Sequence, residues 1–258
     1  MNIPSRVAAS GSVFLLSLFL AGPSPAGGQD VEWAVEGEVG GSLFFGNRSQ
    51  TVLSTRGLAE RVDPVFESTS EVSFTYGRAS DDEGQSFVNR RSWDAATDLA
   101  FRPDQRWSPF VSGKIESSLE RQIDLRFNTG AGMKLVIRRD DLTRIDLSAS
   151  ALAERTFPRH EDGVVEDETR ARWSTRLRFR RDLADERVEF SSETSYRPVF
   201  DDPSDFTLTH RTTLSFDVTD AVRLRLTFVD DYDAGAVDRG ARTNNDGQVQ
   251  VSVVAELD

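Results

Sequence analysis

The chain of 258 residues contains no cysteine, only two histidines and only two methionines. An exported protein without cysteine has no disulfide framework, so its own hydrogen-bonded structure must hold the fold together. The same composition leaves few ligands for a transition metal. We therefore expect neither a metal site nor another cofactor.

Positive charge is also scarce, because 31 Lys and Arg residues are outnumbered by 43 Asp and Glu residues. This acidic balance argues against a nucleic-acid partner, which would require a basic surface. After residue 26, no apolar run approaches the roughly 20 residues that a membrane-spanning helix needs.

The first 26 residues have the organisation of a secretory signal peptide. Arg6 supplies the positive charge, residues 13–21 form a short apolar core, and Gly22-Pro23 precede the small residues at positions 24–26. The apolar core is too short to span a membrane. The sequence therefore predicts export and cleavage, with residues 27–258 as the mature domain.

The segments 169–181 and 187–198 show the strongest pattern in the chain. The first places five arginines on one parity and Ala171, Trp173, Leu177 and Phe179 on the other. Because strand side chains alternate between faces, this is a strand with one cationic and one apolar face. The second segment repeats the pattern with acidic residues, and a five-residue connection predicts a hairpin.

The same alternation recurs from residue 31 to residue 257 and predicts twelve strands. Tight turns near Asp63, Asp104, Asp140, Ala184 and Asp220 alternate with mostly longer loops. An even number of strands, with tight turns at one end and longer loops at the other, is typical of outer-membrane barrels. We predict an all-β, 12-stranded antiparallel up-and-down transmembrane β-barrel.

Alternation alone does not say which face is outside, and a soluble β-sandwich would bury the apolar face. Two features favour the barrel. Aromatic residues gather near the strand ends, as girdles at two membrane interfaces would require. Between them the apolar face carries small residues such as Gly37, Gly41, Ala149 and Ala151, whereas a packed core would need larger side chains.

The segment from Ile123 to Leu135, with Gly46-Asn47 and Lys114-Ile115-Glu116, resembles the salt-induced outer-membrane protein family, domain of unknown function 481. The resemblance extends from about Gly37 to Leu257. It implies an outer-membrane barrel and brings no catalytic residues. Independently of it, Gly130 and Gly132 suit a bend or a close approach between strands.

Enzymatic chemistry has weak support. A phospholipase-like barrel hydrolase needs a nucleophile beside a base, and nothing in the sequence places one beside His210 or His160. The acidic loops lack the spacing of a calcium-binding loop. Carboxylate pairs such as Glu189 and Glu193 have arginine neighbours and fit the wall of a lumen.

We predict a non-enzymatic outer-membrane barrel with a charged lumen, acting as a narrow pore or an envelope structural protein of a Gram-negative-type bacterium. The alternatives are a barrel hydrolase and a soluble exported β-sandwich that binds a ligand. Expected partners are outer-membrane lipid and lipopolysaccharide, the barrel assembly machinery, and small ions or solutes. The predicted lumen-lining residues are Arg170, Arg172, Arg176, Arg178, Arg180, Glu189, Glu193, Arg211, Arg223 and Arg225.

Overall fold

The computed structural model describes residues 31–44, 50–80, 85–159, 167–184 and 187–257, so the predicted signal peptide lies outside the described residues. Twelve strands make up the fold. They are β1 (Glu32–Phe44), β2 (Gln50–Val62), β3 (Phe66–Ser80), β4 (Ser86–Phe101), β5 (Trp107–Ser118), β6 (Ile123–Arg139), β7 (Thr143–Pro158), β8 (Glu168–Leu183), β9 (Val188–Pro198), β10 (Phe206–Thr219), β11 (Val222–Asp233) and β12 (Asn245–Leu257).

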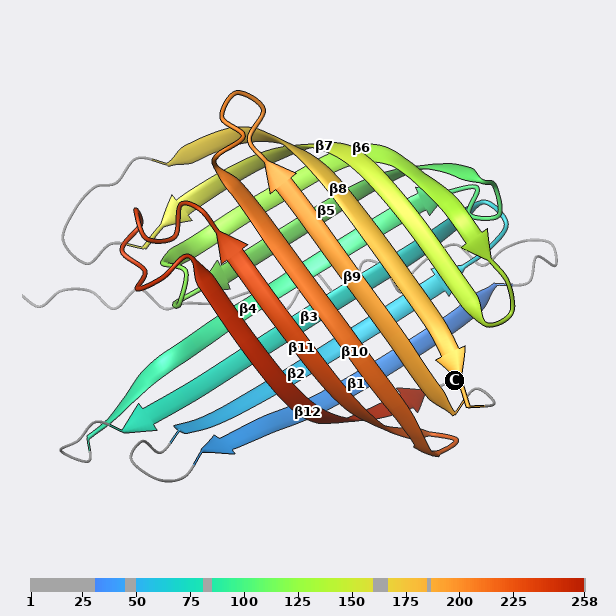
Figure 1. Cartoon of the computed structure of the whole chain (residues 1–258), viewed down its shortest axis with the longest axis horizontal. Coiled ribbons are helices and arrows are strands. Elements are labelled where there is room, and N and C mark those ends of the chain that lie inside the picture. Colours follow the sequence, from blue (N-terminus) through green and yellow to red (C-terminus); the bar gives the residue numbers. More distant parts are fainter. Residues whose placement is uncertain (1–30, 45–49, 81–84, 160–166, 185–186, 258) are drawn as a thin grey trace, which may run out of the picture. The chain divides into compact units, whose positions relative to one another are not determined.

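Each strand pairs antiparallel with the strands before and after it, and β12 pairs with β1, so the sheet closes into a barrel (Figure 1). Along the closing seam, Val39 lies opposite Val253 and Val35 opposite Leu257. The prediction of a 12-stranded antiparallel up-and-down barrel is therefore confirmed. Closure also removes the unpaired edges that an open sheet would expose.

The arginine-rich strand β8 lies between β7 and β9, as its alternating pattern predicts. In the hairpin, Leu177 pairs with Thr194 and Arg178 with Glu193. The Nε atom of Arg178 is 2.5 Å from Oε2 of Glu193. The opposite charges that alternate along the two segments therefore meet on one face of the sheet.

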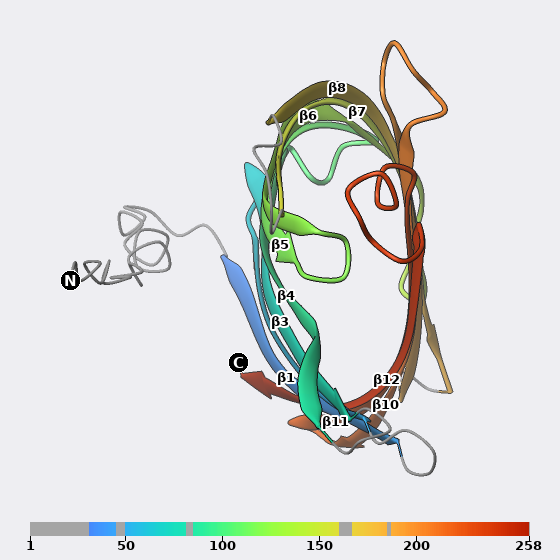
Figure 2. The same cartoon turned by 90° about the vertical axis from the view of Figure 1, so that its left-hand side faces the viewer.

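The connections form two distinct ends. The even-numbered strands run toward one end, called the turn end here, and the odd-numbered strands run toward the other, the loop end. Viewed from the loop end, the β5–β6 turn and the β11–β12 loop lie inside the outline of the sheet (Figure 2). These two connections close part of the opening.

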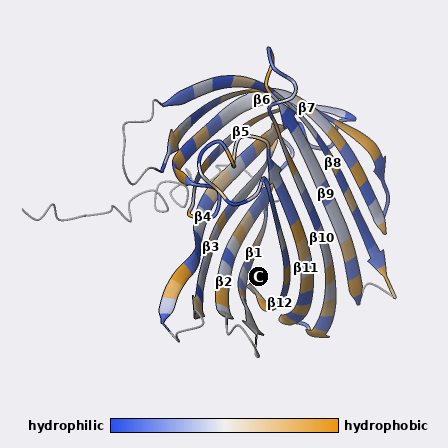
Figure 3. Cartoon of the chain, turned by 60° about the vertical axis from the view of Figure 1, so that its left-hand side comes forward, coloured by the Kyte–Doolittle hydropathy of each residue, from blue (hydrophilic) through white to orange (hydrophobic). Residues whose placement is uncertain are grey.

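The apolar residues face outward. The side chains of Leu177 and Leu224 are 46% and 42% exposed, whereas Arg126 on the opposite parity is only 2% exposed. Hydrophobic and hydrophilic residues alternate along the strands (Figure 3). The β-sandwich alternative needs the apolar face as its core, and the structure instead places polar groups inside a single closed sheet.

Aromatic side chains mark both ends of this outer surface. Trp33 and Trp107 are exposed near the turn end. Near the loop end, the rings of Tyr196 and Phe206 are 5.4 Å apart, and those of Phe206 and Tyr232 are 5.0 Å apart. Two aromatic zones separated by an apolar band are the surface expected of a barrel in a bilayer. Among the described residues, no helix has the length and hydrophobicity to cross a membrane.

Gly130 and Gly132 allow β6 and β7 to approach closely. A Cβ atom at Gly130 would lie 2.6 Å from the carbonyl oxygen of Ala151, and one at Gly132 would lie 2.2 Å from that of Ala149. Such contacts are far inside van der Waals distance. Any side chain would push the strands apart, so the glycines set the path of β6 along the lumen.

Candidate functional site

The interior of the barrel is a charged lumen. It contains a cavity of about 580 Å³ lined by residues from all twelve strands. Inward-facing positions carry hydroxyl, amide, carboxylate and guanidinium groups in place of the aliphatic residues of a soluble barrel core. The lumen is the candidate functional site because it is the large polar concavity of the molecule.

The two sides of the lumen differ in charge. Strands β1–β4 line it with seven carboxylates and one arginine, which are Glu36, Glu38, Glu60, Glu67, Glu71, Asp94 and Asp98 together with Arg56. Strands β8–β11 line it with six arginines and three carboxylates, which are Arg176, Arg178, Arg180, Arg197, Arg211 and Arg225 together with Glu189, Glu193 and Asp231. An acidic wall therefore faces a basic wall.

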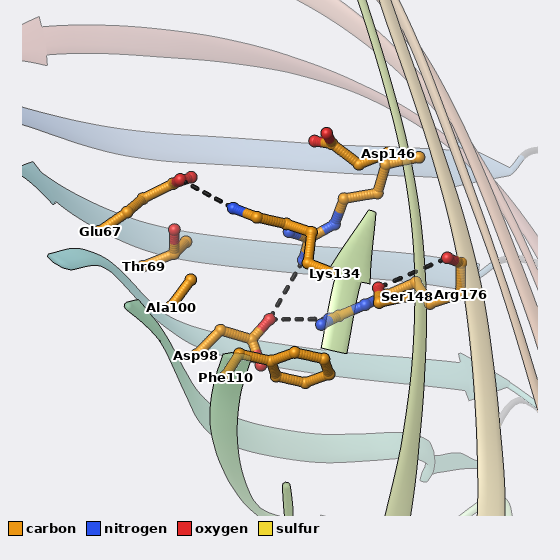
Figure 4. Close-up of a pocket in the computed structure, with 10 residues that line it drawn as sticks. Glu67, Thr69, Asp98, Ala100, Phe110, Lys134, Asp146, Ser148 and Arg176 are labelled. Atoms are coloured by element: carbon orange, nitrogen blue, oxygen red, sulfur yellow. Dashed lines mark hydrogen bonds and ion pairs between the residues drawn. The ribbon is translucent and has the colours of Figure 1, made fainter. Parts of the chain in front are cut away.

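Ion pairs connect these walls in the half of the lumen nearer the turn end. Asp98 of β4 accepts hydrogen bonds from Nη1 of Arg176 at 2.7 Å and from Nη2 of Arg178 at 3.2 Å (Figure 4). Strands β5, β6 and β7 lie between β4 and β8, so these contacts cross the lumen. Arg211 of β10 similarly reaches Glu71 of β3 at 3.5 Å.

Glu67 is the centre of a second group of ion pairs, which forms one layer with those of Asp98. Its carboxylate accepts hydrogen bonds from Nζ of Lys134 at 2.9 Å and from Nη2 of Arg144 at 3.2 Å. The ring of Phe110 lies nearby, with its centroid 5.8 Å from the guanidinium carbon of Arg176. Only about 20 Å³ of free space remains among these groups (Figure 4). The layer therefore narrows the lumen from one side.

A buried cluster, which we call the loop-end plug, narrows the other end. It consists of Glu116, Arg121, Arg126, Glu154, Asp233 and Arg239. Nη2 of Arg126 lies 3.1 Å from Oδ2 of Asp233, which also contacts Nη2 of Arg239 at 2.6 Å. Arg239 belongs to the β11–β12 loop and donates to the carbonyl of Arg121 in the β5–β6 turn at 3.4 Å. The plug thus ties together the two connections that lie inside the barrel outline.

The charges of the plug support one another. Burial alone would lower the pKa of Arg121, but Glu116, Asp231 and Asp233 raise it above its ordinary value. For Arg239, burial lowers the pKa while Asp233 opposes the effect. Both guanidinium groups remain charged at neutral pH because their ordinary pKa is above 12. Two charged guanidinium groups, one from the β5–β6 turn and one from the β11–β12 loop, therefore contribute to the plug.

Seven of the predicted residues line the main cavity: Arg176, Arg178, Arg180, Glu189, Glu193, Arg211 and Arg225. The other three predicted residues, all arginines, are not among those that line the main cavity. Arg223 contacts Asp217 at 2.9 Å and Glu36 at 3.4 Å near the turn end. Arg170 pairs with Glu168 at 3.1 Å and also contacts Asp205.

Arg172 is only 2% exposed and holds the β9–β10 loop. Its Nε donates to Glu154 at 2.9 Å, its Nη1 donates to the carbonyl oxygens of Arg197 and Asp205, and its Nη2 contacts the Asp205 carboxylate. A role in fixing the loop follows from these contacts.

The sequence does not show which residues meet across the lumen. Asp98 and Glu67 are on the inward parity of their strands, but nothing local shows that each meets cations from β6, β7 or β8. Arg126 and Asp233 are equally inconspicuous, because each occupies one of many alternating polar positions. The available signal was parity, which marks a residue as inward without identifying what it contacts.

His210 lies on the outer face of β10, between two threonines. Its Nδ1 is 2.9 Å from Oγ1 of Thr194 and its Nε2 is 2.9 Å from Oγ1 of Thr212. Each ring nitrogen thus has a hydroxyl partner, which satisfies a polar ring on an apolar surface. His160 lies outside the described residues. In the part of the chain that the structure describes, no group of three or more His, Asp or Glu side chains is arranged to hold a metal.

A closed antiparallel barrel with an even number of strands, an apolar outer band and a charged interior has the fold of an outer-membrane β-barrel. The chain belongs to the family described as "Protein of unknown function, DUF481", whose model matches residues 37–256. The resemblance to domain of unknown function 481 is thereby confirmed over nearly the same range, without the description as salt-induced. No curated protein sequence matches the chain.

Among solved structures, the NanC porin aligns with a TM-score of 0.49 and 11% identity, covering 88% of this chain and 100% of that one. The KdgM porin gives a TM-score of 0.44 and 10% identity, covering 87% and 99%. An outer-membrane channel from Pseudomonas putida F1 gives 0.42 and 10%, covering 90% and 96%.

Proposed function

We propose that the protein resides in the outer membrane of a Gram-negative-type bacterium and forms a narrow pore for small hydrophilic solutes and ions. The observation that carries this proposal is the predominantly polar lining of the cavity, to which every strand contributes. The outward side chains of the same strands are apolar. A wall that is polar inside and apolar outside suits an aqueous path through a bilayer.

The lumen is narrow because charged side chains from opposite walls meet within it. The contacts of Asp98 with Arg176 and of Arg126 with Asp233 cross it at two levels. Twelve strands place the barrel between filled eight-stranded barrels and wide 16-stranded porins. We expect a small conductance that depends on salt, because ions screen the pairs that lie across the path.

The outer surface supports an environment of lipid. Exposed Trp33 and Trp107 near the turn end suit one interface, and exposed Phe87 and Tyr196 near the loop end suit the other. We infer contacts with phospholipid and lipopolysaccharide there. Insertion would follow export through a cleaved signal peptide and require the barrel assembly machinery. The proposal assigns no catalytic reaction to the barrel.

The test is the conductance of the purified, folded protein in a planar lipid bilayer. We expect discrete small steps, with a control of heat-unfolded protein giving none. An absence of steps from a barrel that migrates as folded on a gel would overturn the pore and favour an envelope structural protein. Steps as large as those of a wide general porin would overturn the narrow lumen.

A further inference from the structure

Several buried polar atoms of lumen-lining residues have no hydrogen-bond partner, and two of them belong to Ser195 and Asn128. Ser195 of β9 is 2% exposed and Asn128 of β6 is 8% exposed, and both line the main cavity. The Oγ atom of Ser195 and the Oδ1 atom of Asn128 make no hydrogen bond in the structure. Buried polar groups are normally paired because leaving them unpaired is costly. Both atoms are therefore able to form a hydrogen bond with a polar ligand in the lumen.

The wall around Ser195 offers charges of both signs. By strand register, Ser195 lies beside Thr209, and Thr209 lies beside Asp231 of β11. Arg197 occupies the next inward position on β9. Among the described residues, neither the Arg197 guanidinium nor the Asp231 carboxylate forms an ion pair or hydrogen bond with another side chain. This distinguishes them from the many cavity-lining charges that have direct partners.

The wall formed by β5 and β6 also combines a polar atom without a hydrogen-bond partner, Oδ1 of Asn128, with charged groups. Lys114 of β5 lies directly beside Asn128. Its ammonium group is 2.9 Å from Glu116 and is also close enough to Asp94 and Arg197 to interact electrostatically with both. Asp94 accepts a hydrogen bond from Ser73 at 2.5 Å. Cationic and anionic groups from β5, β9, β4 and β11 thus line the same cavity, and Lys114 contacts Glu116 of the plug.

We propose that this part of the lumen binds small zwitterions that carry a carboxylate and a protonated amine. The carboxylate would be held by Arg197 and Lys114, and the amine by Asp231 and Asp94. Ser195 and Asn128 would complete the hydrogen bonds. A molecule with a single charge satisfies only one of the two sets, so the site discriminates by charge pattern. The inference deepens the proposed pore by naming a class of solute for it.

Saturation-transfer NMR on the folded barrel in detergent micelles tests the site directly. The probes are β-alanine, propionate and propylammonium, which have similar size and differ in charge. We expect β-alanine to bind about tenfold more tightly than either singly charged probe, as one additional charge-assisted contact would produce. Equal signals from all three probes, or none from β-alanine, would overturn the proposal.

Variants identify the residues. Arg197→Gln and Asp231→Asn should each weaken β-alanine binding about tenfold, and Arg197→Lys should restore part of it. The matched control is Arg180→Gln, which removes a cavity-lining arginine that is 54% exposed and paired with Glu189. The control should bind as the parent does. If the control and the two site variants behave alike, the assignment is wrong.

Conductance measured on the same preparations separates this proposal from the pore itself. Binding of β-alanine without conductance would support the site and overturn the pore. Conductance without selective binding would support the pore and overturn the site. Folding of each variant is checked first by the heat-dependent shift in its gel mobility. Ser195→Ala, which removes only one oxygen, provides a conservative second variant for the hydroxyl contact.

Discussion

The Nη2 atom of Arg126 lies 3.1 Å from the Oδ2 atom of Asp233, although the two residues are on β6 and β11. Four strands, β7 to β10, separate them around the barrel by the shorter route. Both side chains are almost completely buried. This pair therefore crosses the loop end of the lumen, and it joins the β5–β6 side of the barrel to the β11–β12 loop through Arg239.

Asp233→Asn should open the loop end. The change removes the carboxylate that Arg126 and Arg239 share, so the β11–β12 loop loses its charged attachment. We expect the conductance of single channels to rise several-fold in a planar bilayer. The control is Asp124→Asn, an exposed carboxylate at the same end that pairs with Arg159 at 3.2 Å. An unchanged conductance in folded Asp233→Asn would show that the plug does not limit flow.

Replacing Arg176 and Arg178 together with serine should widen the other constriction. Asp98 then loses both cross-lumen partners, and the basic wall loses two charges. We expect a larger conductance and a reversal potential shifted toward cation selectivity. Arg172 is left intact because it holds the β9–β10 loop. The Arg138→Ser control, at an exposed position beside a turn, should change neither quantity.

Leu177→Arg and Leu224→Arg should impair assembly, because each places a charge on the lipid-facing surface. The expected cost is about 2–4 kcal/mol near the bilayer midplane. Folding into lipid vesicles, followed by the heat-dependent shift in gel mobility, measures it. Arg176→Ser on the inward face should fold like the parent, since Arg178 still reaches Asp98. Equal assembly of inward and outward variants would contradict the assignment of faces.

Gly132→Ala should destabilise the barrel by about 1–3 kcal/mol or more, in the manner of an overpacked site. The added Cβ would meet the Ala149 carbonyl oxygen at 2.2 Å, which requires β6 and β7 to separate. Urea unfolding in lipid vesicles measures the loss. Gly113→Ala on neighbouring β5 is the matched control, because a Cβ there meets nothing within 4 Å. Similar stabilities would rule out a close-approach role for Gly132.

The β6–β7 turn should contribute a small pH-dependent stability. A hydrogen bond from Arg138 is the main cause that lowers the pKa of Asp140 below its ordinary value. A carboxyl whose pKa is lower in the folded state stabilises the fold above its unfolded pKa. This stabilisation is lost as the pH falls through the folded pKa. Carboxyl NMR titration should show the Asp140 pKa rising in Arg138→Ala, and an unchanged value would refute the contribution.

The alternation of side chains was enough to predict the fold and its facing. Five of the six arginines of 169–181 share one parity, as do the carboxylates of 187–198, and the structure places most of these residues on the cavity wall. Parity is a local property, because each residue of a strand points opposite to its neighbour whatever the rest of the chain does. Strand number and the alternation of tight and long connections are local as well. Together these local features were sufficient to predict a closed barrel.

The contacts across the lumen could not be predicted in this way. Arg126 and Asp233 are separated by 107 residues, and Arg176 and Asp98 by 78. Whether such residues meet depends on the order of closure, on the stagger between strands and on the close approach of β6 and β7 that Gly130 and Gly132 allow. The local sequence determined which side chains face the lumen. Closure of the barrel decided which of them are paired there and which, like Arg197 and Asp231, form no ion pair or hydrogen bond with another described side chain.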